Sequence, residues 1–182
     1  MNRSIVIGAA AVLVGAAGYA GSDLSASPAS PARVKQQSGF LLLPPAAPAG
    51  QMVLFGHIKR LTRTGSRFRL RFDPAWFTSG ITANTAAAED GVVPKGQPVP
   101  NDNYIVDESH RLLTYLVSPS AHVTVLTNQG TKGISATPIT VAELARIVNG
   151  GKHLKLFEPL DSGVWIRVRV DTVRELDQQY RP

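Results

Sequence analysis

The 182-residue chain contains no cysteine. It therefore has no disulfide framework, no thiolate nucleophile and no cysteine-based zinc site, and a packed apolar core must supply its stability. The sequence also lacks a Gly-x-Ser-x-Gly elbow, a phosphate-binding glycine loop and histidines at metal-binding spacing. It thus indicates no catalytic residue, no metal site and no cofactor, and an enzyme is the less favoured class of protein.

Positive charge is in excess of negative charge, but the basic residues form no Lys/Arg-rich block. The formal net charge is +6 and the sequence pI is about 10.0. The excess is spread along the chain. Its positive sign favours anionic partners such as envelope polymers, anionic lipid or nucleic acid, with no specific nucleic acid implied. With 43% hydrophobic and 18% charged residues, the chain is typical of one globular domain with tails.

The first 20 residues match a secretory signal peptide. A positive MNR precedes the small, apolar run SIVIGAAAVLVGAAGYA, and small residues at Gly18 and Ala20 predict cleavage after Ala20. The run is short for a bilayer span, which needs about 20 residues, so an uncleaved membrane anchor is the less favoured alternative. The sequence therefore predicts an exported protein, secreted or associated with the cell envelope.

An Ala/Ser/Pro-rich segment, residues 21–50, follows the signal segment. Its composition cannot bury enough apolar surface to offset the entropy of ordering, so it is interpreted as a linker. The exception is FLLL at residues 40–43, for which docking on the domain as a short strand is favoured over insertion in a lipid surface. A single globular domain is predicted over residues 51–182.

Short strands dominate the predicted domain. Period-2 alternation and turn residues indicate strands at residues 52–61, 67–73, 104–107, 111–117, 122–127, 164–170 and 173–176. Gly65 predicts a hairpin turn, and Pro74 is expected to end the second strand because it cannot donate to a ladder. One helix is expected through AAA at 86–88, capped by Ser79 or Thr82. Another is expected over 141–148, with Thr140 and Glu143 forming a capping box.

This pattern predicts a mainly β (α+β) fold. The first choice is a small, antiparallel, partly open β-barrel of the oligonucleotide/oligosaccharide-binding (OB) type, with two short helices. A two-layer α+β sheet is the alternative. Trp76 and Phe77, in the DPAWF turn, are expected to cover one end of the barrel.

The order of several motifs resembles a family of uncharacterised exported bacterial proteins with one small β-rich domain. The resemblance covers about residues 51–182 and implies export and a single domain, but no activity. Its motifs in this sequence are Gly56, DPAWF at 73–77, AAAEDG at 86–91, PNDNY at 100–104, VTVL at 123–126, VAELARIV at 141–148 and QQYRP at 178–182.

The most polar stretch is NDNYIVDESH, residues 101–110. Its candidate ligands for a hard cation are Asp102, Asp107, Glu108 and His110. A calcium loop needs oxygen ligands at alternating positions and a glycine for its sharp turn, but here the glycine is missing and Tyr-Ile-Val interrupts the carboxylates. A solvated loop with a hairpin turn is therefore favoured. Asp73 and Asn101-Asp102 are expected to anchor turns by accepting backbone N–H bonds. For an enzyme, the pair to test would be Asp73 with Asp102 or Asp107.

Arginines alternate with apolar residues in two predicted strands. Phe68, Leu70 and Phe72 are expected to face the core, and the outward face carries Arg67, Arg69 and Arg71. A second strand repeats the pattern with Trp165, Arg167 and Arg169. A solvated strand face that prevents edge aggregation is the simpler interpretation. If the two strands were neighbours, the six residues would form one basic, aromatic binding face.

Two functions follow as hypotheses. The first is an exported, non-catalytic binding or interaction domain, for an anionic envelope polymer or a protein partner. The second is an exported hydrolase-like enzyme that uses a carboxylate pair. Strand adjacency and a cleft with two carboxylates of raised pKa distinguish the two hypotheses.

Overall fold

The computed structural model describes residues 46–108 and 111–181. The chain divides into two compact units, residues 1–35 and 36–182, and every described residue lies in the second unit. The predictions for the signal segment, most of the linker and residues 40–43 fall outside the described residues. No helix in the described part is both long and apolar enough to cross a bilayer.

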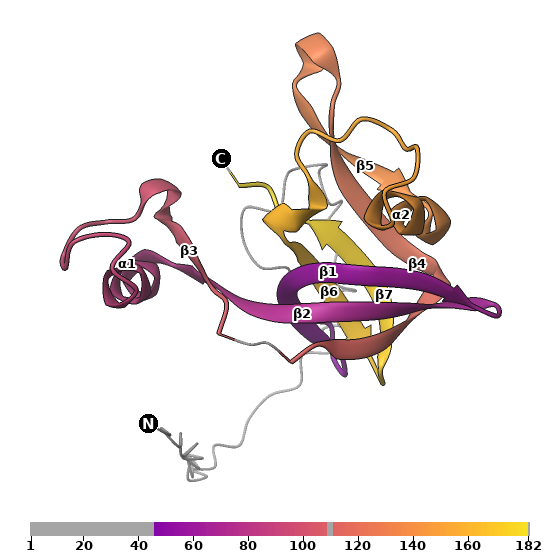
Figure 1. The fold of residues 1–182 in the computed structure, drawn as a ribbon, viewed down its shortest axis with the longest axis horizontal. Helices are drawn as coiled ribbons and strands as arrows, with labels where there is room; N and C mark the ends of the chain where they lie inside the picture. Colours follow the sequence, from indigo (N-terminus) through magenta and orange to yellow (C-terminus); the bar gives the residue numbers. More distant parts are fainter. Residues whose placement is uncertain (1–45, 109–110, 182) are drawn as a thin grey trace, which may run out of the picture. The chain divides into compact units, whose positions relative to one another are not determined.

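Five strands form a closed barrel (Figure 1). They are β1 (Met52–Thr64), β2 (Arg67–Ser79), β4 (Leu113–Asn128), β6 (Val164–Arg169) and β7 (Thr172–Gln178). The order around the barrel is β2-β1-β6-β7-β4, and pairing of β4 with β2 closes it. If the barrel strands are numbered 1 to 5 in chain order (β1, β2, β4, β6 and β7), they follow one another around the barrel as 1-2-3-5-4, and strand 4 lies beside strand 1.

The predicted small β-barrel of OB type with two short helices is confirmed. The expected barrel was antiparallel and partly open. In the structure, pairing of β2 with β4 closes the barrel, and one pair of strands, β4 and β7, is parallel. β4 and β7 run parallel, because the other four pairs of the five-strand ring are antiparallel and four reversals leave the fifth pair with the same direction. The long connection through β5, α2 and β6 permits this pairing. The remaining barrel pairs are antiparallel.

Two short strands and two helices are added to the barrel. They are β3 (Asn103–Val106), β5 (Ile134–Ile139), α1 (Gly80–Glu89) and α2 (Val141–Val148), with 3₁₀ turns at Pro100–Asp102, Gly130–Lys132 and Leu160–Ser162. The strands expected at 111–117 and 122–127 are one continuous strand, β4. β5, which pairs with the end of β4, was not predicted.

The alternation in β2 builds one side of the core. Phe68, Leu70 and Phe72 are buried, as predicted, in a cluster with residues of β1, β4, β6, β7 and α2. The prediction that Pro74 ends this strand is wrong, because β2 continues to Ser79. On the edge of β2 away from β1, residues up to Phe72 pair with β4 and residues from Trp76 pair with β3. Pro74 lies in the gap between these two described ladders, where the backbone N–H that proline lacks is not required for a strand-to-strand hydrogen bond.

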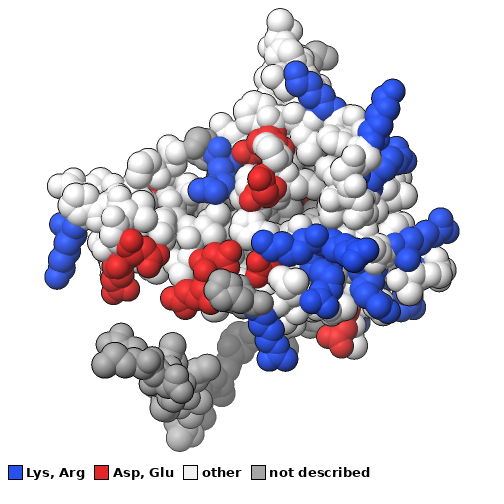
Figure 2. Space-filling model, viewed as in Figure 1, with Lys and Arg blue, Asp and Glu red and all other residues white. Residues whose placement is uncertain are grey.

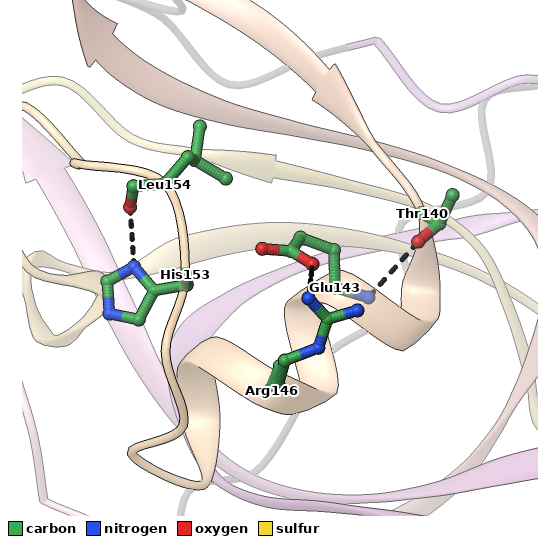
Figure 3. Close-up of polar contacts among 5 residues, drawn as sticks. All are labelled: Thr140, Glu143, Arg146, His153 and Leu154. Carbon is green, nitrogen blue, oxygen red and sulfur yellow. Dashed lines mark hydrogen bonds and ion pairs between the residues drawn. The ribbon is translucent and has the colours of Figure 1, made fainter.

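The start of α2 follows the predicted capping only in part. The Thr140 hydroxyl accepts a hydrogen bond of 3.1 Å from the Glu143 backbone N–H, as an N-cap should (Figure 3). The Glu143 carboxylate does not return a bond to Thr140 and instead forms an ion pair of 2.6 Å with Arg146. For α1 the N-cap is Ser79, but its side chain makes no capping hydrogen bond.

Candidate functional site

The outward face of the β1–β2 hairpin is basic. Arg67, Arg69 and Arg71 are exposed, as the alternation predicts. Their partners across the ladder on β1 are Thr64, Thr62 and Arg60. We call the four exposed arginines, Arg60, Arg67, Arg69 and Arg71, the basic face. Figure 2 shows that Lys and Arg side chains gather over the hairpin, whereas most carboxylates visible in this view lie away from it.

Arg60 was not among the residues predicted for this face, although it continues the outward alternation of Thr64 and Thr62 on β1. The register shifts between Ile58 and Arg60, so Lys59 and Arg60 both fall on the outward side. Lys59 forms an ion pair of 3.0 Å with Asp73, and Arg60 lies opposite Arg71. The sequence contains a signal for this placement. The turn at Gly65 pairs Thr64 with Arg67, and every second residue of β1 before Thr64 then lies on the same face as the β2 arginines, which includes Arg60.

The charges of the basic face are not neutralised within the described part of the chain. No Asp or Glu among residues 46–108 and 111–181 forms an ion pair with any of the four arginines. On the β4 side, Arg71 lies opposite Thr114 and Arg69 opposite Leu116, neither of which carries a charge. The face therefore presents free positive charge on two neighbouring strands.

The second arginine strand does not join this face. β1 lies between β2 and β6, so the condition that would unite the six residues is not met. Trp165 is only 6% exposed, and its indole N–H donates to Gln179 Oε1 at 2.5 Å. Arg167 is largely buried in an ion pair with Glu175, and Arg169 is exposed at the end of β6. Trp165 and Arg167 therefore stabilise the fold and are not available for stacking or charge recognition.

Trp76 and Phe77, which were both expected to cover one end of the barrel, lie in different environments. Phe77 packs against Phe55 with ring centroids 5.2 Å apart, and both contact Trp165. Trp76 is 72% exposed and does not cover the end of the barrel as predicted, because it lies where β2 has left the barrel to pair with β3.

A cavity of about 800 Å³ lies between β1, α2 and the segment before β6. His57 and Lys59 on β1, Asp107 after β3, and His153 and Glu158 before β6 contribute polar groups to its lining. The His153 imidazole is oriented by a hydrogen bond from Nδ1 to the Leu154 carbonyl (Figure 3).

Glu158 lines this cavity with a partly buried carboxylate whose pKa is raised. Burial raises its pKa, and the negative charge of Asp161 acts in the same direction, against the lowering effect of Arg181. Its Oε1 atom is buried without a hydrogen-bond partner in the described structure. A buried oxygen without a donor stabilises the charged carboxylate poorly, in agreement with the raised pKa.

The carboxylates proposed for an enzyme do not converge on this cavity. Asp73 is bound by Lys59, and Asp102 accepts a hydrogen bond of 3.1 Å from the Gly80 N–H at the start of α1. Of the three candidates, only Asp107 lines the cavity. Within the described residues, no three His, Asp or Glu side chains are grouped so that they could hold a metal ion.

Comparisons with protein-family models, curated proteins and solved structures found no match to this chain. The resemblance to exported bacterial proteins therefore stays a prediction, and functional argument depends on the residues of the fold itself.

Proposed function

We propose that this protein is an exported, non-catalytic binding domain that holds an anionic polymer of the cell envelope on its basic face. The observation that carries the proposal is the set of four exposed arginines, Arg60, Arg67, Arg69 and Arg71, without a carboxylate partner in the described chain. A protein partner with an acidic surface would use the same face.

The position of the face in the barrel supports a binding role. β2 and β4 are the second and third strands of the barrel, and that surface is where OB folds bind oligonucleotides and oligosaccharides. This is analogy at the level of the fold, and fold alone does not determine function. The arginines supply the chemical argument, because each can contact an anionic group directly.

The spacing of the arginines suits a linear polymer. Alternate residues of a strand lie about 7 Å apart, so Arg67, Arg69 and Arg71 can each meet a different anionic group of one extended chain. Binding of this kind releases counterions from the polymer, and its affinity falls steeply as salt rises. Planar guanidinium groups also bind phosphate or carboxylate with two hydrogen bonds.

The test compares two triple variants with the same change in charge. Arg67, Arg69 and Arg71 are changed to Gln in one, and the exposed Lys95, Lys152 and Arg174 in the other. Fluorescence anisotropy measures binding to labelled polyphosphate and polyglutamate at low salt. We expect the first variant to lose most of the affinity and the second to lose little. Equal losses, or wild-type protein that ignores both polymers at low salt, would contradict the proposal.

One observation favours the alternative hydrolase-like enzyme. Glu158, with its raised pKa, shares the cavity with Asp107 and Asp161. A carboxyl group that stays protonated above its ordinary range can act as a general acid. Release of sugars from envelope glycan by the wild-type protein, lost in Glu158→Gln and retained in the basic-face variant, would favour this function over binding.

Export is part of the proposal and depends on the first 20 residues. A positive start, an apolar run and small residues before Gly21 support it. We expect the mature protein to begin near Gly21, which mass spectrometry of the exported protein measures. A membrane-bound product that retains Met1 would favour an uncleaved anchor.

A further inference from the structure

β1 and β2 separate at one end of their ladder. Their last cross-strand pair is Phe55 with Ala75. Beyond it, the start of β1 pairs with β6, and the end of β2 pairs with β3. Figure 1 shows β2 running on toward β3 and α1, away from the barrel. The divergence leaves a wedge between the first residues of β1 and the last residues of β2.

The wedge is an apolar groove. It has a volume of about 370 Å³, and its lining includes Val53, Leu54, Phe55, Ala75, Trp76 and Phe77. None of the described residues that line it carries a charged side chain. Of the lining residues, Trp76 is 72% exposed, and Met52, which precedes Val53 in β1, is 57% exposed. Apolar surface of this kind marks a place where another apolar group binds.

Both walls of the groove are strand edges. In the described chain, Met52–Leu54 have a ladder partner only on the β6 side, and Trp76–Ser79 only on the β3 side. Their groove-facing backbone groups are therefore open to a further strand. An extended apolar peptide can add to such an edge, with backbone hydrogen bonds for affinity and side-chain pockets for selectivity.

We propose that residues 40–43, FLLL, bind in this groove as a short added strand and complete the domain. FLLL is an uninterrupted apolar run within an otherwise Ala/Ser/Pro-rich segment. Four extended residues suit a groove whose open edges are three or four residues long.

The chain connection favours this occupant. Residues 44–51 separate FLLL from β1, and an extended linker of that length reaches roughly 26 Å. The chain turns immediately before β1, where the Gln51 N–H donates to the Pro48 carbonyl at 3.0 Å. A segment tethered this closely has an effective concentration of the order of millimolar, which a free partner does not reach.

Other occupants fit the groove less well. A second copy of the protein would need to bury about 1,000 Å² or more to form a stable interface, and this groove holds only a few side chains. A charged polymer would find no charged side chain in the lining that residues 46–108 and 111–181 provide. The groove and the basic face are therefore separate surfaces, and this inference does not depend on the proposed function.

Hydrogen exchange of the full chain tests the proposal. The first variant combines Leu41→Asp with Leu43→Asp, which places charge in the groove. The matched control combines Leu24→Asp with Val34→Asp, which adds the same charge elsewhere in the linker. In the wild type we expect residues 40–43 to exchange at least about tenfold more slowly than an unstructured peptide. The first variant should lose this protection and speed exchange at Val53, Leu54 and Phe77, whereas the control should match the wild type.

Protection of the core amides Val117 and Val173 shows in the same measurement that each variant remains folded. Wild-type residues 40–43 that exchange as an unstructured peptide would overturn the proposal, as would groove amides that do not respond to the first variant. Protection that rises with protein concentration, together with a doubled mass in solution, would assign the groove to a second copy and overturn it as well.

Discussion

Arg60 on β1 and Arg71 on β2 are direct cross-strand partners, and both side chains are exposed. Two like charges in this arrangement oppose folding, because neighbouring side chains on one face of a ladder lie close together. The chain keeps this repulsion on the surface to which we assign binding. An anionic ligand would relieve the repulsion, so the unfavourable pair is consistent with a binding face.

Replacing Arg71 with Gln should stabilise the protein at low salt. Removal of one charge of the Arg60–Arg71 pair should raise the free energy of unfolding by about 0.2–1 kcal/mol. The gain should shrink as salt screens the repulsion. Urea unfolding at two salt concentrations measures it, and Arg174→Gln, at an exposed position on β7, is the control. A loss of stability would show that Arg71 has a favourable structural contact.

Replacing Phe72 with Ala should remove much of the stability of the domain. Phe72 is fully buried in the central cluster and contacts Tyr115 with ring centroids 6.4 Å apart. The substitution leaves a cavity and should lower the free energy of unfolding by about 3–5 kcal/mol. Calorimetry or urea unfolding measures the loss. The neighbouring Arg69→Gln should change stability little, because exposed charges contribute little.

Replacing Gly56 with Ala should be severely destabilising, although it adds only one methyl group. A Cβ at this position would lie 2.1 Å from the Asp73 carbonyl oxygen and 2.9 Å from the Phe72 ring. Relief of this clash requires β1 and β2 to move apart, so we expect a loss of about 3 kcal/mol or more in urea unfolding. Gly65→Ala is the control. Gly65 has φ of +58° but open space around it, and the strain there should cost about 1–2 kcal/mol.

Replacing Asp177 with Asn should stabilise the protein at neutral pH. Burial raises the pKa of Asp177, and this outweighs the hydrogen bond from the Thr124 hydroxyl and the nearby positive charge of Arg167. Between the ordinary pKa of aspartate and this raised value, the folded state binds more protons than the unfolded state. Stability therefore falls as pH rises through that window and stays lower above it.

An Asn side chain still accepts the Thr124 hydrogen bond but carries no charge. The stability advantage of Asp177→Asn should thus be largest at about pH 7 and shrink toward about pH 4, as measured by urea unfolding at both values. An advantage that grows as the pH falls would contradict the assigned direction of the shift.

Local patterns in the sequence predicted local structure well. The alternation from Arg67 to Phe72 identified which side chains are buried, because a slip of one residue would bury three cations. Thr140 was identified as an N-cap because its hydroxyl needs only a backbone N–H three residues away. These features depend on neighbours in the chain, and neighbours are visible in the sequence.

Features that depend on distant residues were not predictable in the same way. Trp165 and Arg167 fit the pattern of an exposed face, but Phe55, Gln179 and Glu175 cover or bind them. Their exposure depends on which strands lie beside β6, and a single sequence does not contain that information. The bulge that places Lys59 on the same side as Arg60 likewise follows from the fit between β1 and β2.

The place of the last two strands determines when the barrel can assemble. β6 and β7 are made from residues 164–178, and they lie between β1, near the start of the domain, and β4, in its middle. A chain that is still being synthesised, and that ends before Val164, can form only an open sheet of β1, β2 and β4, with β3 and β5 added to it, in which the edges that β6 and β7 would cover are unpaired. Folding must await the C-terminal end, and pairings between such distant segments form slowly. Premature termination near the C-terminus should therefore yield a species prone to edge-to-edge aggregation rather than a slightly shortened domain.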